Sequence, residues 1–345
     1  MQRFLAYFVL VATIYFGVSL TLASVVVDYR DPIDRTNPEW RAIYAPDWGI
    51  PPSNTVEITN GDKVLVADIY EHPSEADCAV IIAHGLRGDR NLVRLYGTMF
   101  YNLGCDVLGY DFAPRNNSNA LLTYGYEEKS DLAAVVDWLA DYTALPKSRI
   151  GIWGGSYGAA TTLQLLAEED ELAWVIADSS FASMPRLLDE QAENLFGMAI
   201  EPILPTTYFI IERRLGFNMD VVSPEDSVVG NDVPLLLLHS TADELIYAQN
   251  SQAIYANTNP ETTRLIYMDW GSAHMQSYID NPETYTHYVY AFLRKFAPDF
   301  SSTLTPQQSL TDSPRIDQIT FVQGLKQQII PHPEPTTPDM SAFIE

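Results

Sequence analysis

Three side chains of this chain have the types needed for an activated nucleophile: Ser156, Asp243 and His274. A serine hydroxyl is a weak nucleophile until a base takes its proton, and the base needs a carboxylate to orient it. The three residues follow one another in the order serine, aspartate, histidine. We therefore expect Ser156 to be a nucleophile, with His274 as its base and Asp243 as the carboxylate that orients the base.

Ser156 stands in the stretch "GGSYG" at residues 154–158, between an apolar run and an alanine-rich run. This matches G-x-S-x-G, a motif that places a serine on a tight turn between a strand and a helix. Such a turn strains the backbone, so the residues two before and two after the serine must lack bulk. Two other glycine motifs are excluded. No Gly-Lys-Ser/Thr is present for a phosphate-binding loop, and Trp153 stands where a dinucleotide fingerprint needs glycine.

The choice of base follows from the positions of the six histidines. His274 lies in "GSAH", a loop of small residues after the last strand-like run. A loop at that place can bring an imidazole over the carboxyl edge of the sheet, where the Ser156 turn must also lie. The others are at less suitable places, in a polar turn, at two strand ends, within the last helix and near the C-terminus: His72, His84, His239, His287 and His332.

The candidate acid is chosen in the same way. Asp243 comes a few residues after the buried run "PLLLLHS", and therefore lies at the same edge of the sheet. Its neighbour Glu244 is the alternative, and we expect that side chain to face solvent. No metal-ligand spacing of Cys or His is present, so no metal and no cofactor are expected.

Strand-like and helix-like segments alternate along most of the chain. Apolar runs at 78–84, 105–111, 149–153, 173–179 and 233–240 have the composition of buried parallel strands. Helix-like runs separate them, and "TVEIT" and "KVLVADIYE" flank an Asn-Gly-Asp turn typical of a hairpin. This alternation predicts an α/β fold, a mostly parallel central sheet with helices on both faces.

With these motifs in place, the sequence resembles the α/β-hydrolase superfamily over about residues 50–298. The resemblance depends on "HGLRG", "GYDFAPRN", "GGSYG", "HSTADEL" and "GSAH", in that order. Among its branches, the chain is most similar to bacterial single-domain hydrolases of the serine aminopeptidase or lysophospholipase-like group. The resemblance implies an oxyanion hole formed by the backbone N–H groups of Leu86 and Tyr157, and a structural role for His84.

The chain departs from the family pattern in two loops. The usual Asp-x-Arg-Gly-x-Gly loop is replaced at 111–118 by "DFAPRNNS", which has no glycine. Ser240 stands where a glycine commonly follows the strand-ending histidine. Neither change touches the expected triad, but both are expected to alter the shape of the pocket.

The chain is expected to have four parts: an anchor or signal segment at 1–27, a linker at 28–52, the catalytic domain at 53–298 and a disordered tail at 299–345. The uncharged N-terminal run from Phe4 to Val27 would be about 36 Å long as a helix, enough for a hydrocarbon core of about 30 Å. An uncleaved single-pass anchor is favoured over a signal peptide, whose apolar region is shorter. The short N-terminal tail favours an extracytoplasmic catalytic domain, and cleavage would make the protein secreted.

Charge and cysteines exclude some functions. The chain has 45 acidic and 20 basic residues, a formal net charge of −25, so a nucleic-acid partner is not expected. Cys78 and Cys105 lie in apolar runs, and we expect buried free thiols, as is common for cysteine. A disulfide would need neighbouring strands and an oxidising compartment.

An apolar insertion at about 182–228, without clear strands, is expected to form a helical cap over the site. Whether it binds acyl chains or only packs on the sheet stays open. Three functions are considered. The favoured one is hydrolysis of a small-molecule carboxylic ester through an acyl-enzyme on Ser156. A peptidase for short peptides would share the triad and use acidic residues to bind an amine, with candidates Glu190, Glu193 and Glu201. A non-catalytic binding protein is least favoured, because no triad residue is missing.

Overall fold

A computed structural model of the 345-residue chain describes residues 2–28, 50–86, 88–113, 121–298 and 300. Most of the expected linker, the loop residues 114–118 and nearly all of the expected C-terminal tail lie outside the described residues.

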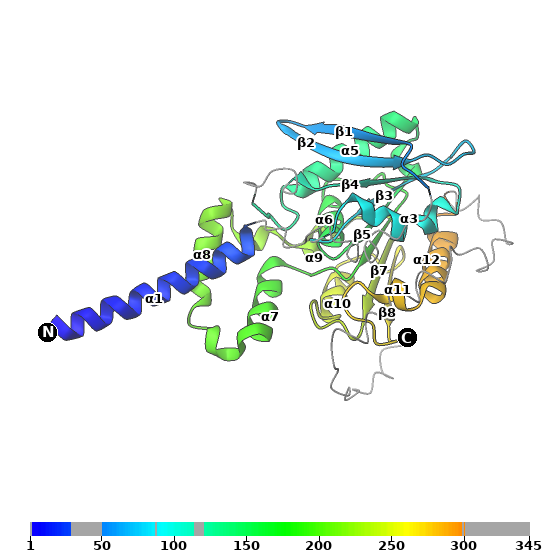
Figure 1. The fold of residues 1–345 in the computed structure, drawn as a ribbon. Helices are drawn as coiled ribbons and strands as arrows, with labels where there is room; N and C mark the ends of the chain where they lie inside the picture. The colour runs from blue at the N-terminus through cyan, green and yellow to red at the C-terminus, as the bar shows by residue number, and fades with distance from the viewer. Residues whose placement is uncertain (1, 29–49, 87, 114–120, 299, 301–345) are drawn as a thin grey trace.

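The core of the fold is an eight-stranded sheet in the order β1-β2-β4-β3-β5-β6-β7-β8 (Figure 1). The β1–β2 hairpin is antiparallel, β2 is antiparallel to β4, and the other neighbours are parallel. The predicted α/β class and the predicted hairpin are therefore confirmed. The strands are β1 (Asn54–Asn60), β2 (Lys63–Tyr70), β3 (Ala79–Ala83), β4 (Asp106–Tyr110), β5 (Ile150–Gly155), β6 (Trp174–Asp178), β7 (Leu235–Ser240) and β8 (Thr263–Met268).

Helices cover both faces of the sheet, because side chains alternate along each strand. In β3, Ile81 faces one buried apolar cluster and Val80 and Ile82 face the other. The first cluster includes side chains of α5, α6 and α10, and the second includes those of α3, α11 and α12. The bounds are α3 (Val93–Tyr101), α5 (Glu128–Thr143), α6 (Tyr157–Leu165), α10 (Gln249–Ala256), α11 (Ser277–Asp280) and α12 (Pro282–Phe296).

The two cysteines correct one expectation, since Cys78 and Cys105 form a disulfide with their Cα atoms 4.8 Å apart. Cys78 comes just before β3 and Cys105 just before β4. These two strands are parallel neighbours, with Ala79 opposite Asp106. The preceding residues are therefore opposite one another too. The expectation of free thiols was wrong because this register joins residues far apart in the sequence.

The insertion between β6 and β7 folds into three α-helices joined by two short 3-10 turns: α7 (Met184–Phe196), α8 (Leu204–Leu215) and α9 (Pro224–Ser227). Figure 1 shows α7 and α8 projecting from the sheet on the side of the N-terminal helix. We call α7, α8 and the turn between them the cap. Its helices have apolar residues that face the first cluster, including Leu188 and Ile211, so part of the insertion packs on the domain.

The N-terminal helix α1 (Gln2–Val27) packs against α8 (Figure 1). The Tyr15 hydroxyl donates to the Pro202 carbonyl at 2.9 Å and pairs with the Thr206 hydroxyl at 2.7 Å. At the other end of α8, Arg214 donates to Ser24 Oγ at 3.0 Å. The segment Val9–Val27 has a mean hydropathy of 2.1, and by length and composition it could cross a membrane.

Candidate active site

Ser156 lies on the turn between β5 and α6, in a backbone conformation that non-glycine residues rarely adopt, with φ 54° and ψ −116°. Its backbone N–H donates to the Asp178 carbonyl at 2.8 Å, which holds the turn against β6. The strained turn displays the hydroxyl at the carboxyl edge of the sheet, as the G-x-S-x-G pattern predicts.

The glycines around Ser156 are required by close backbone contacts. A Cβ atom at residue 158 would lie 2.2 Å from the Ala83 carbonyl oxygen, and one at residue 154 would lie 2.6 Å from the Gly158 carbonyl oxygen. Gly155 has a role that the motif does not specify. A Cβ there would lie 2.3 Å from Cε of Met275, the neighbour of His274. The serine turn and the histidine loop therefore pack directly against one another.

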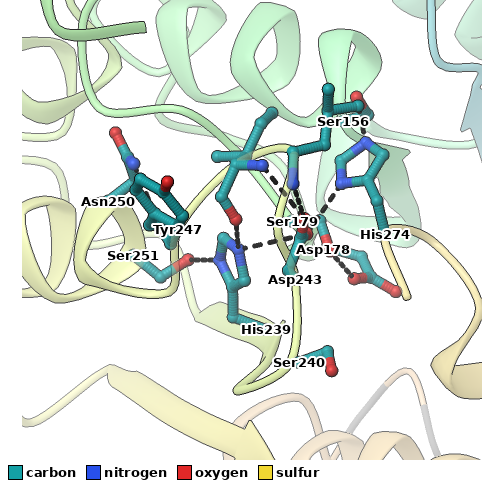
Figure 2. A network of polar contacts seen from close by, with 12 residues as sticks. Ser156, Asp178, Ser179, His239, Ser240, Asp243, Tyr247, Asn250, Ser251 and His274 are labelled. Atoms are coloured by element: carbon teal, nitrogen blue, oxygen red, sulfur yellow. Dashed lines mark hydrogen bonds and ion pairs between the residues drawn. The ribbon is translucent and has the colours of Figure 1, made fainter. Parts of the chain in front are cut away.

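Ser156, His274 and Asp243 form a hydrogen-bonded line, shown in Figure 2. His274 Nε2 is 2.8 Å from Ser156 Oγ, and its Nδ1 is 2.7 Å from Asp243 Oδ2. A carboxylate only accepts hydrogen bonds, so Nδ1 carries the proton and Nε2 is left to accept from the serine hydroxyl. This is the tautomer that a general base needs. The structure thus brings together the three residues chosen from the sequence.

The Asp243 carboxylate is held on both oxygens. Oδ1 accepts the backbone N–H groups of Leu245 and Ile246, each at 2.9 Å, and Oδ2 faces His274. A second histidine, His239, has its Nε2 3.4 Å from Oδ2. Burial alone would raise the pKa of Asp243, but the hydrogen bonds from His239, His274 and Ile246 hold that pKa well below its ordinary value. The carboxylate therefore stays ionised at neutral pH.

His239 is fully buried behind Asp243 (Figure 2). Its Nε2 is 2.8 Å from the Ile246 carbonyl, and its Nδ1 is 2.7 Å from Ser251 Oγ. A carbonyl only accepts, so Nε2 carries a proton and can also donate toward Asp243. His239 fastens the loop after β7 to α10, and through that loop it holds the carboxylate in place.

Ser240, one of the two departures from the family pattern, links the acid strand to the histidine loop. Its hydroxyl donates to the Ser272 carbonyl at 2.6 Å, and the Ser272 hydroxyl donates to Asp280 at 2.5 Å. Farther along the loop, the Tyr96 hydroxyl donates to the Met275 carbonyl at 3.0 Å. A glycine at 240 could not make the first bond. These contacts hold His274 in place, and the sequence pattern alone did not indicate them.

The two expected oxyanion donors are the N–H groups of Tyr157 and Leu86, and each belongs to a segment that lies next to Ser156. Tyr157 is the first residue of α6, so its N–H has no acceptor within the helix. A Cβ at Gly85, the neighbour of Leu86 in the chain, would lie 3.9 Å from Ser156 Oγ, so Gly85 lies close to the nucleophile. His84 Nδ1 lies 2.6 Å from the Gly85 carbonyl, and the ring packs on Phe112. This is the structural position expected for His84.

Arg90 joins the two loops beside the oxyanion donors, a role that the sequence pattern did not indicate. Its guanidinium binds Asp111 at 2.6 Å, in the loop after β4, and Asp68 at 2.9 Å, in β2. Its backbone N–H also donates to Asp111 at 2.8 Å. The segment at Arg90 is therefore linked to β2 and to the loop after β4 by one partly buried ion-pair network.

The acidic residues considered as amine anchors occupy different surroundings. Glu190 pairs with Arg186 at 2.9 Å and accepts from Asn250 at 2.9 Å, so both of its oxygens have partners within the protein. Glu193 and Glu201 are exposed on the cap. Among the residues that the structure describes, no group of three or more His, Cys, Asp or Glu side chains could hold a metal ion.

Helix α7 is fastened to the loop that carries Asp243. The Asn194 amide donates to the Glu244 carbonyl at 3.3 Å, and Gln191 donates to the Leu245 carbonyl. Together with the bond between Glu190 and Asn250, these contacts place the cap next to the acid side of the site.

Comparisons with known proteins show the family of the chain. The family model described as "Prolyl oligopeptidase family" matches residues 106–298, more than half of the chain. The uncharacterized protein YqkD of Bacillus subtilis is 30% identical over 224 residues, which cover 64% of this chain and 72% of that protein. A probable dipeptidyl-aminopeptidase B of Ajellomyces dermatitidis is 25% identical over 137 residues, covering 36% of this chain and 13% of that protein.

Among solved structures, the esterase Pf2001 of Pyrococcus furiosus superimposes with a TM-score of 0.55 at 25% identity, covering 73% of this chain and 95% of that chain. The α/β-hydrolase fold predicted from the motifs is therefore confirmed.

Proposed function

Because this chain belongs to the prolyl oligopeptidase family, a family of serine hydrolases, we propose that it hydrolyses a carboxylic ester through an acyl-enzyme on Ser156. The observation that carries the proposal is the unbroken line of hydrogen bonds from Ser156 through His274 to Asp243, at 2.8 and 2.7 Å. A binding protein with this fold would have no need of that geometry.

In the first half of the reaction, His274 Nε2 takes the Ser156 proton while Oγ bonds to the ester carbonyl carbon. The carbonyl oxygen becomes negative and is bound by the N–H groups of Leu86 and Tyr157. Each such donor typically stabilises the transition state by about 3–4 kcal/mol. The imidazolium then protonates the leaving alcohol as its C–O bond breaks, which leaves the acyl group on Ser156. In the second half, water attacks by the same route, and the products are the carboxylic acid and the free serine.

The surroundings of the acidic residues favour an ester substrate over a peptide substrate. An aminopeptidase-like site needs an unpaired carboxylate for the substrate amine. Glu190 is already bound to Arg186 and Asn250, and Glu193 and Glu201 are exposed on the cap. The likeness to the esterase Pf2001 supports the same choice.

The peptidase is the second candidate, and it is favoured by the family match and by the similarity to a probable dipeptidyl-aminopeptidase B. The finer resemblance to the serine aminopeptidase or lysophospholipase-like group is compatible with either substrate.

A substrate panel tests the choice. We expect the full chain to release p-nitrophenol from p-nitrophenyl esters of rising acyl length and to leave aminoacyl p-nitroanilides almost untouched. Absorbance of the released chromophore measures both reactions in one buffer. Turnover of the anilides alone would contradict the ester assignment and support the peptidase. Turnover of neither class, with no labelling by a fluorophosphonate probe, would contradict the hydrolase assignment itself.

We also propose that α1 is an uncleaved anchor, and two observations support this. The sequence "TLA" before Ser24 is only a weak signal-peptide cleavage site. It lies inside a helix that packs on α8, and its last residue, Ala23, is fully buried. Cleavage there would remove Tyr15 and its bonds to the cap. The disulfide, a bond that persists in oxidising compartments, supports an extracytoplasmic domain.

The anchor is tested by the intact mass of the chain extracted from membranes. We expect this mass to include residues 1–23. A mature N-terminus at Ser24 would contradict the anchor and support a secreted enzyme.

A further inference from the structure

The length of α1 that is free of the cap is too short to cross a bilayer. Tyr15 is bonded to Pro202 and Thr206 at the start of α8, and Ser24 is bonded to Arg214 near its end. Helix α8 thus runs beside the second half of α1 in the same direction. Within the described residues, Gln2 to Ile14 project past it, about 20 Å of helix at 1.5 Å per residue, and the charged Arg3 ends the apolar run on that side. A hydrocarbon core is about 30 Å thick.

The remaining thickness of the hydrocarbon core, about 10 Å, must be crossed by the part of α1 that packs against α8. If α1 spans the membrane, the start of α8 and the end of α7 therefore enter the leaflet on the side of the catalytic domain. Elements that lie in a membrane interface bury their apolar face by about 5–10 Å, so the depth required here is within the usual range.

The surface of the cap at this level includes large apolar side chains that are exposed. Phe209 on α8 is 62% exposed, and Leu195 and Phe196 at the end of α7 are 71% and 49% exposed. Large apolar side chains of this kind seldom stand in water together, and they mark an interaction surface. On α1, Ile14 and Phe16 are also more than half exposed, which extends the apolar surface along the anchor.

The charged residues of α8 lie at the end of the helix that would stay outside the leaflet. The sequence from Leu204 to Ile211 has no charge, and Glu212, Arg213 and Arg214 follow at the end nearer the sheet. That end is level with Ser24 and Asp28, where α1 changes from apolar to charged residues. Glu193 and Glu201 are acidic and exposed on the cap, and the chain is strongly acidic, so attraction to anionic headgroups would not favour binding.

From these observations we propose that the end of α7 and the start of α8 lie in the lipid leaflet beside α1, as a second membrane contact. The proposal depends on the proposed anchor, and it does not depend on the reaction at Ser156. The contact is with the apolar region of a zwitterionic bilayer rather than with anionic headgroups. Because α7 is bonded to the loop of Asp243, this contact places the site at the membrane surface, where long-chain acyl esters are dissolved.

The chain offers a clean labelling experiment, because its two cysteines are both in the disulfide. A cysteine introduced at an exposed position is therefore the single free thiol. We choose Phe209→Cys on the cap and Val229→Cys, just before β7, as the matched control, since both side chains are 62% exposed. Ile14→Cys reports whether α1 is inserted, and Leu195→Cys gives an independent measurement on α7.

Each full-length variant is labelled with a nitrobenzoxadiazole fluorophore and reconstituted in phosphatidylcholine vesicles, with or without bromine on the acyl chains. We expect bromolipid to quench the labels at 14, 195 and 209 by roughly threefold or more, as for groups within the leaflet, and to leave the label at 229 unchanged.

Quenching at 14 without quenching at 195 and 209 would overturn the proposal and leave the anchor intact. If emission at all four positions is the same with and without bromine, both the second membrane contact and the anchor are overturned. A blue shift of the labels at 195 and 209 that needs no lipid and grows with protein concentration would assign the surface to a second copy of the chain, and would also overturn the proposal. Hydrolysis does not enter the measurement, so failure of the proposed ester chemistry is detected separately by the substrate panel.

Discussion

Replacing Ser156 with alanine is expected to abolish covalent labelling by a fluorophosphonate probe and to lower kcat for p-nitrophenyl esters by about six orders of magnitude. The reason is that Oγ is the atom that bonds to the substrate, and His274 is hydrogen-bonded to it at 2.8 Å. An alanine fits the turn without a clash, so the variant should fold. Gel fluorescence of the probe and initial rates of ester hydrolysis measure the two effects.

The matched control is Ser130→Ala, the same chemical change at an exposed serine on α5. This variant should label and turn over as the unchanged chain does. Probe labelling that survives in Ser156→Ala would show a different nucleophile and remove the basis of the proposed mechanism.

Replacing Asp243 with asparagine is expected to lower kcat by about four orders of magnitude while leaving the fold intact. An asparagine Oδ1 can still accept the N–H groups of Leu245 and Ile246, so the loop keeps its bonds. Its NH2 group, however, would face His274 Nδ1–H, and two hydrogen-bond donors cannot bond to each other. The imidazole then turns to the other tautomer, in which Nε2 carries the proton and cannot accept the proton of Ser156.

The control for this prediction is Glu244→Gln, which neutralises the adjacent acidic side chain. That side chain is exposed, and its interaction with Asn194 uses the backbone carbonyl, so kcat should change by less than about twofold. Thermal unfolding of both variants separates catalysis from stability. A large loss in Glu244→Gln with little loss in Asp243→Asn would assign the acid to Glu244 instead.

The ionisation of Asp243 adds a pH test within the same measurement. Because its pKa is held well below the ordinary value, the carboxylate stays charged as the pH falls through the weakly acidic range. A loss of activity in that range must then come from protonation of another group. We expect the acid limb of the kcat/KM profile to show no contribution from protonation of Asp243.

The site could be predicted from sequence because its parts follow from strand direction. Parallel strands end at the same edge of the sheet, so residues just after three strand-like runs had to meet there. Ser156, Asp243 and His274 lie at that edge, and their identities followed from the short list of serine motifs and histidines. Knowledge of the loop conformations was not needed for that choice.

What could not be predicted depends on contacts between distant segments. The pairing of Cys78 with Cys105 follows from the register of β3 on β4, which neither apolar run reveals by itself. The bond from Ser240 to Ser272 joins two loops, and the bond from Tyr15 to Pro202 joins an N-terminal helix to the cap. Such side-chain contacts have no periodicity and no motif, so only the folded chain shows them.

The bond from Ser240 to Ser272 has a consequence for thermal motion. It ties the end of β7, which leads to Asp243, to the loop that carries His274. A fluctuation that displaces one loop therefore carries the other with it, and the 2.7 Å bond between acid and base is preserved. The close packing of Met275 on Gly155 couples the Ser156 turn to the same unit. Thermal motion is therefore expected to displace the three segments together and to leave the distances between serine, imidazole and carboxylate little changed.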